Sequence, residues 1–168
     1  MRCTADVAFG EGVDCPCNAA EISRVCEFVL REENVEQNCF VSVSLVSDDE
    51  IRALNRTWRE IDRATDVISL ECERPEDVLS PDEPCELGDI VLAPAYIERQ
   101  ARQFGTPYEQ EFKLLLVHGM LHLLGYDHLE EEEAQMMERR EDEILALLVG
   151  EPTVRHTMIT RHQGDDEP

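Results

Sequence analysis

Apolar and polar positions follow two rhythms along the chain, one with the period of a β-strand and one with that of an α-helix. Residues 39–46 (CFVSVSLV) alternate apolar and small polar side chains, the pattern of a half-buried strand. Residues 19–32 carry apolar side chains at helical spacing and predict an amphipathic helix. Further strands are predicted at residues 3–9, 65–70 and 89–93.

Local signals mark where the other predicted helices begin and end. Ser47 and, three residues later, Glu50 form a capping box that opens a helix running to about Trp58. Three more helices are predicted at residues 94–103, 108–124 and 130–149. Gly125 ends the second of these, and the acidic first turn of the last one suits the helix macrodipole.

This order of elements predicts one compact α+β domain over residues 1–150, with a small mixed sheet packed against several helices. Between the last two strands, residues 71–87 are acidic and contain three prolines, which is typical of an exposed loop. After Gly150 the composition turns polar, so residues 151–168 are expected to form a flexible acidic tail.

The composition agrees with a cytoplasmic protein. A chain of 168 residues with 42% apolar content can form a proper core. Its longest apolar run has six residues, whereas about 20 are needed to span a bilayer, so we do not expect a membrane protein. The first residues show no secretory signal, and we expect the seven cysteines to be reduced thiols, several of them buried.

The net charge of −23 is the main argument against a nucleic-acid substrate, because phosphate contacts need basic side chains. Its distribution weakens that argument. Residues 71–89 hold eight acids and one arginine, and residues 129–168 hold twelve acids and four arginines. By contrast, residues 49–63 are neutral, with four acids and four arginines.

Three of the five histidines fall within eleven residues. On a helix, His118 and His122 project from one face, and the bend at Gly125 can bring His128 towards the same point. Three imidazoles with one open side are the ligand set of a catalytic zinc, so we expect one Zn²⁺ per chain, with other divalent metals as possible occupants. The alternative is three unrelated histidines on and after an apolar helix.

Two neighbouring residues bear on this chemistry. Asp127 can accept a ring N–H from a metal-binding histidine, act as a general base, or simply form the turn. The spacing HxxxHxxGxxH is also that of the metzincin peptidases, whose general base is a glutamate beside the first histidine. This chain has Gly119 there, so the usual peptidase mechanism lacks its proton acceptor.

At this point the chain resembles the YbeY-type endoribonucleases, also called rRNA maturation factors. Their signature HGxLHLxGYDH matches residues 118–128. Residues 54–59 with 65–70 are similar to the family's LNxxYR and PTDVLSF segments, and residues 88–90 to its GDI segment. Trp58, Ala64 and Leu70 depart from the pattern, and we expect these changes to alter packing more than chemistry.

The resemblance implies a zinc held by His118, His122 and His128 and a functional arginine at Arg59. It implies cleavage of single-stranded RNA, in maturation of the 3′ end of small-subunit ribosomal RNA and in ribosome quality control, with the ribosome or its proteins as partners. A planar guanidinium suits a phosphodiester, whereas Arg52 and Arg63 fit a solvated, charge-balanced helix face better. Two alternatives stay open, a ribosome-assembly factor with a structural metal and a zinc metallopeptidase.

Overall fold

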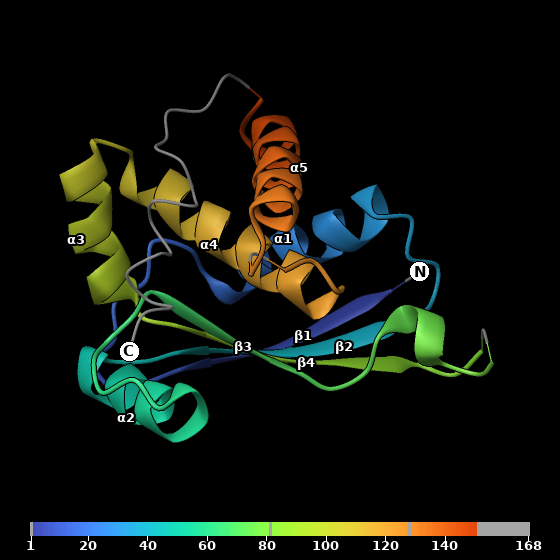
Figure 1. Ribbon diagram of the computed structural model, residues 1–168, viewed down its shortest axis with the longest axis horizontal. Helices are drawn as coiled ribbons and strands as arrows, with labels where there is room; N and C mark the ends of the chain where they lie inside the picture. Colours follow the sequence, from blue (N-terminus) through green and yellow to red (C-terminus); the bar gives the residue numbers. More distant parts are fainter. Residues whose placement is uncertain (1, 81, 128, 151–168) are drawn as a thin grey trace.

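A mixed four-stranded sheet forms the centre of the protein (Figure 1). The structure is a computed structural model that describes residues 2–80, 82–127 and 129–150. The strands lie in the order β1, β2, β4 and β3, with the bounds Cys3–Phe9, Cys39–Leu45, Cys85–Leu92 and Val67–Glu71. The first three are parallel, and β3 runs antiparallel to β4 at one edge.

Five α-helices are present among the described residues, in agreement with the predicted α+β class. They are α1 (Ala19–Glu32), α2 (Asp48–Arg59), α3 (Pro94–Phe104), α4 (Tyr108–Leu123) and α5 (Glu131–Val149). Figure 1 shows α1, α4 and α5 over one face of the sheet and α2 against the opposite face. None of these helices is long and apolar enough to cross a membrane.

The core has one large and one small layer, on opposite faces of the sheet, because successive side chains of a strand point to opposite faces. The inward-facing positions of β2, such as Val41 and Val43, are buried beneath the helices together with most of α4. On the other face, Ile51 of α2 packs with Ile68 and Val91 of the sheet. Helix α4 therefore lies between the sheet and α5, with apolar side chains on nearly all sides.

The predicted start of α2 is confirmed. The Ser47 hydroxyl accepts a hydrogen bond from the Glu50 N–H at 3.2 Å, and Glu50 reaches back to the Ser47 N–H. The helix ends at Arg59 because Glu60 adopts a left-handed conformation, with φ of 60°. The last described helix begins at Glu131, one residue later than predicted, with its acidic first turn in place.

The prediction of an exposed loop over residues 71–87 is wrong in part. Strand β4 begins at Cys85, four residues earlier than expected, and both Cys85 and Leu87 are fully buried. Its pairing with β3 requires Gly88, which has φ of 135° and where an added Cβ would lie 2.1 Å from the Leu70 carbonyl oxygen. The predicted tail, residues 151–168, lies outside the described residues.

Candidate functional site

A pocket of about 410 Å³ opens where the end of α2, strand β3 and the end of α4 meet. Most of the candidate site residues predicted from the sequence line this pocket. Its lining consists of Trp58, Arg59, Val67, Ile68, Ser69, Leu70, His118, His122, Asp127 and Leu129. Two imidazoles, a guanidinium and a carboxylate thus meet over an apolar floor, which is the composition of a binding or catalytic pocket.

The two histidines of α4 line this pocket together, as their spacing of four residues predicted. His118 is only 5% exposed, whereas His122, one turn later, is half-buried. The helix beneath them approaches the sheet closely at Gly119. A Cβ at that position would lie 3.0 Å from Ile90 Cγ2 and 3.2 Å from Ser69 Oγ. The space that a peptidase glutamate would need is therefore filled by the sheet.

Glu141 of α5 is a site residue that the sequence analysis missed. Its carboxylate is fully buried and contacts Nδ1 of His118. The neighbouring Arg140 fixes α5 against the end of α1, because its guanidinium donates to Glu33 Oε2 at 2.6 Å and to the Glu32 carbonyl at 2.8 Å. The carboxylate is thereby held on the side of the imidazole away from Nε2.

The turn after α4 brings Asp127 to the pocket. Gly125 has φ of 107°, as expected for the residue that ends a helix, and the Tyr126 N–H donates to the Leu121 carbonyl at 3.1 Å. A Cβ on Gly125 would lie 3.3 Å from Nη1 of Arg74. His128, the third predicted ligand, lies outside the described residues, so the structure describes two of the three histidines.

Arg59 reaches the pocket from the last residue of α2 and is half-buried there. The segment after it is fixed by Asn55, whose side-chain amide is buried and donates to the Arg63 carbonyl at 2.9 Å. Arg52, by contrast, is 55% exposed and pairs with Asp62 at 2.9 Å, which confirms the solvated helix face expected for it.

A buried polar network ties β3 to the helices that carry the site. The Nε2 amide of Gln100, in α3, donates to Asp66 Oδ2 at 3.1 Å and to Glu111 Oε2 at 3.0 Å. Asp66 directly precedes β3, and Glu111 lies in the first turn of α4. The network therefore sets the position of the pocket wall relative to the histidine helix.

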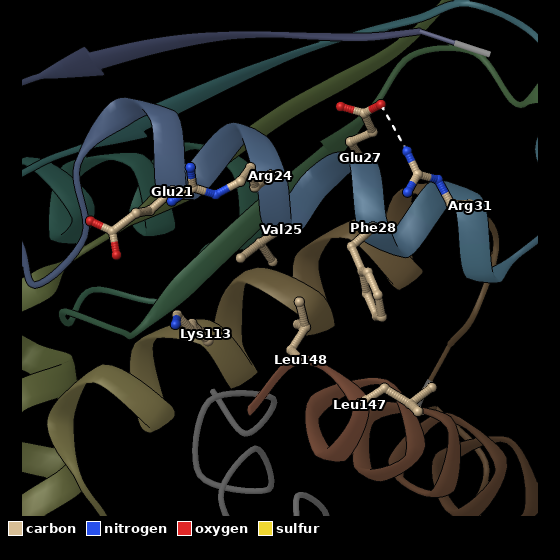
Figure 2. Close-up of a pocket in the computed structure, with 9 residues that line it drawn as sticks. All are labelled: Glu21, Arg24, Val25, Glu27, Phe28, Arg31, Lys113, Leu147 and Leu148. Atoms are coloured by element: carbon tan, nitrogen blue, oxygen red, sulfur yellow. Dashed lines mark hydrogen bonds and ion pairs between the residues drawn. The ribbon is translucent and has the colours of Figure 1, made fainter. Parts of the chain in front are cut away.

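A second hollow, of about 440 Å³, lies between α1, α4 and the end of α5. Figure 2 shows its lining, in which Glu27 and Arg31 form an ion pair of 3.2 Å. The lining combines three basic and two acidic side chains with apolar ones, and none of its residues is a histidine. The pocket at the end of α4 is thus the better candidate for a metal site.

Comparison with known proteins decides the family. The family model described as endoribonuclease YbeY matches residues 13–149, which is most of the chain. The chain belongs to the YbeY family. Similar curated proteins are also named endoribonuclease YbeY. That of Exiguobacterium sibiricum is 41% identical, over 74% of this chain and 82% of its own. That of Stutzerimonas stutzeri is 42% identical, over 77% of this chain and 78% of its own.

The fold agrees with that of a solved structure. The solution structure of a Thermotoga maritima protein is 30% identical and superposes with a TM-score of 0.58. The alignment covers 88% of this chain and 90% of that chain. The resemblance to YbeY proteins drawn from residues 118–128 and the two shorter segments is therefore confirmed over nearly the whole described chain.

Within this YbeY fold, one other group of side chains could hold a metal ion among the described residues. Ligand atoms of Cys17, Glu21 and Glu109 lie within 4.8 Å of one another. Glu21 already serves the capping box of α1, and Glu109 pairs with Lys113 at 3.0 Å. Burial raises the pKa of the Cys17 thiol to about 12, which disfavours the thiolate that a metal would require.

The cysteines agree with the prediction of reduced, partly buried thiols. All seven are free, and Cys17, Cys26, Cys39 and Cys85 are buried. Burial raises the pKa of the Cys39 thiol to about 11 and that of the Cys85 thiol to about 12. These thiols are therefore protonated at neutral pH and have a packing role.

Trp58 corrects an expectation about the departures from the family pattern. We expected it to affect packing, but 60% of its surface is exposed and its side chain lines the pocket beside Arg59. A large aromatic residue with this exposure contributes little to the core. Trp58 therefore contributes to the pocket wall more than to the core.

Proposed function

We propose that this chain is a metal-dependent endoribonuclease that cleaves single-stranded RNA. The observation that carries the proposal is the meeting of His118, His122 and Arg59 in one pocket of a YbeY-family chain. Relatives more than 40% identical are named endoribonucleases, which supports the same reaction class here. The substrate step is hydrolysis or transesterification of a phosphodiester bond.

The donor set at the end of α4 fits a metal ion of the zinc type. We infer that His118 and His122 bind it together with His128, one ion per chain, with other divalent metals as possible occupants. The Glu141 carboxylate beside Nδ1 of His118 favours the tautomer with its proton on Nδ1, so that Nε2 carries the lone pair. When bound, a divalent cation at this place polarises a phosphate oxygen or a water molecule.

Two side chains of the pocket act directly on the substrate in this proposal. Arg59 presents a planar, permanently charged guanidinium, which binds a phosphodiester and stabilises the extra negative charge of its transition state. Asp127 is the only carboxylate among the described residues that line the pocket, and we assign it as the proton acceptor for the attacking hydroxyl.

We further propose that the cellular substrate is ribosomal RNA, near the 3′ end of the small-subunit RNA, and that the chain acts in the cytoplasm in ribosome maturation and quality control. The charge supports targeting by the ribosome. With −23 overall, the chain binds phosphate backbones weakly at long range. Contacts to ribosomal proteins would then bring the neutral arginine stretch to the RNA.

The proposal is tested by cleavage of an end-labelled, unstructured RNA and of its duplex with a complementary strand. We expect the wild type to cut only the single strand. His118→Ala and His122→Ala should abolish cleavage, and Arg59→Glu should lower it by about 100-fold or more, because one stabilising donor is replaced by a like charge. Arg56→Glu is the matched control, on the same helix but exposed and outside the pocket.

Two outcomes would contradict the proposal. Undiminished cleavage by the histidine variants would remove the metal role. Normal ribosomal RNA maturation in cells that carry only those variants, with failure when the protein is deleted, would favour an assembly factor with a structural metal. A peptidase is disfavoured because Ile90 and Ser69 occupy the space beside Gly119.

A further inference from the structure

Trp58 lies at the mouth of the pocket in a position that packing does not explain. It is the only tryptophan of the chain, it occupies the next-to-last position of α2, and 60% of its surface is exposed. Leu129, in the connection between α4 and α5, lines the same pocket and is 78% exposed. The pocket thus has polar groups that suit a phosphate, and it has exposed apolar side chains that suit a different, apolar part of the substrate.

We propose that Trp58 stacks on an unpaired nucleobase of the RNA, next to the phosphate held by Arg59. This inference rests on the proposed function and identifies a substrate-binding residue for it. Every base has a flat π-face, and aromatic side chains beside basic ones are the usual way to bind single strands without sequence preference. Adjacent positions on α2 then bind the two parts of one nucleotide, Arg59 its phosphate and Trp58 its base.

The stacking contact accounts for selectivity towards single strands. In an RNA duplex both faces of a base are covered by its neighbours in the stack, so an indole ring has no face to contact. An unpaired base in a loop or a single-stranded end can turn outwards onto the ring. The same pocket therefore rejects duplex RNA without reading its sequence.

The charge of the protein makes such a contact necessary. Single-strand binders usually combine aromatic stacking with a positive groove. Here the arginine stretch is only neutral, and the whole chain carries −23. Stacking is an attraction that does not depend on net charge, so its contribution should persist at salt concentrations that weaken the phosphate contact of Arg59.

The single tryptophan gives a direct readout without any substitution. The wild-type chain is titrated with a single-stranded 2′-O-methyl octaadenylate, checked afterwards for integrity, while the indole fluorescence is recorded. We expect saturable quenching by this probe. The same strand annealed to its complement, and an abasic backbone of equal length, should leave the fluorescence unchanged.

Kinetics supply the second readout. Loss of one base-stacking contact corresponds to roughly a 5- to 150-fold change in binding. Trp58→Ala should therefore raise KM for single-stranded RNA by such a factor with little change in kcat, whereas Trp58→Tyr and Trp58→Phe, which keep a ring, should stay within a few-fold of the wild type. Phe40→Ala is the matched control, an exposed aromatic of β2 outside the pocket.

The outcomes separate this inference from the proposed function. Normal cleavage with no quenching and an unchanged KM in Trp58→Ala would overturn the stacking role and leave the nuclease intact. If Trp58→Ala instead lost only its binding to ribosomal particles, the ring would be a protein contact and the inference would be wrong. Absence of any RNA cleavage by the wild type would refute the proposed function. The stacking inference would then depend on the fluorescence titration, in which an unchanged signal would refute the stacking role.

Discussion

The contact between Glu141 and His118 allows a sharp test of the metal site. The Glu141 carboxylate is fully buried and contacts the imidazole from the side of Nδ1. Glu141→Gln keeps the size and shape of the side chain but removes its charge. If the carboxylate orients His118 and raises its basicity for a metal, the substitution should weaken metal binding without disrupting the fold.

The expected magnitude follows from the kind of contact. Loss of a group that orients a metal-binding histidine typically costs roughly 10- to 100-fold in metal affinity. That range corresponds to about 1.4 to 2.7 kcal/mol at 25 °C. The stability of the metal-free protein should change little, because the amide keeps the shape of the side chain and its oxygen can still accept a hydrogen bond from Nδ1 of His118.

The measurement is a competition titration of Zn²⁺ between the protein and a chromophoric chelator, with thermal unfolding of the metal-free proteins followed in parallel. Glu132→Gln is the matched control, because Glu132 is exposed on the same helix and its substitution removes the same charge. A zinc affinity unchanged in Glu141→Gln would refute the orienting role. An equal loss in both variants would show a general effect of charge.

Two further predictions concern stability and reactivity. Gln100→Leu removes the amide shared by the buried carboxylates of Asp66 and Glu111, so the free energy of unfolding in urea should fall by about 3 kcal/mol, whereas Gln103→Leu on the exposed side of α3 should change it little. Burial raises the pKa of the Cys17 thiol to about 12 and that of the Cys39 thiol to about 11, so little of either thiol is ionised at pH 8. A disulfide reagent should therefore modify the exposed Cys72 first and the buried thiols only after unfolding. Fast modification of Cys39 in the native protein would contradict this prediction.

Local patterns were enough to predict the helices and most strands. The capping box at Ser47 and the stop at Gly125 act within one turn of the chain, and both are present as expected. The start of β4 was missed because the alternation of Cys85, Glu86 and Leu87 is short and breaks at Gly88, and pairing with β2 and β3 extends the strand across this break. Strand pairing is a property of distant residues, which periodicity does not reveal.

The side chains that line the pocket could be predicted from the sequence, but the buried residues that hold them in place could not. His118 and His122 follow from helical spacing, and both line the pocket together with Arg59. Glu141 was overlooked among the many acids of α5, although it falls in line with the buried Ala134, Met137 and Ile144, where a charge needs a partner. Asp66 and Glu111 are 45 positions apart in the numbering, so their shared amide from Gln100 could come only from the fold.

The proposed zinc nuclease is best tested by the metal dependence of RNA cleavage by the purified 168-residue chain. The zinc content per chain is determined first, and cleavage of an unstructured RNA is then measured before chelation, after chelation and after zinc is restored. We expect about one zinc per chain, loss of single-strand cleavage on chelation and its recovery with zinc. Full cleavage by a chain shown to be free of metal would contradict this expectation.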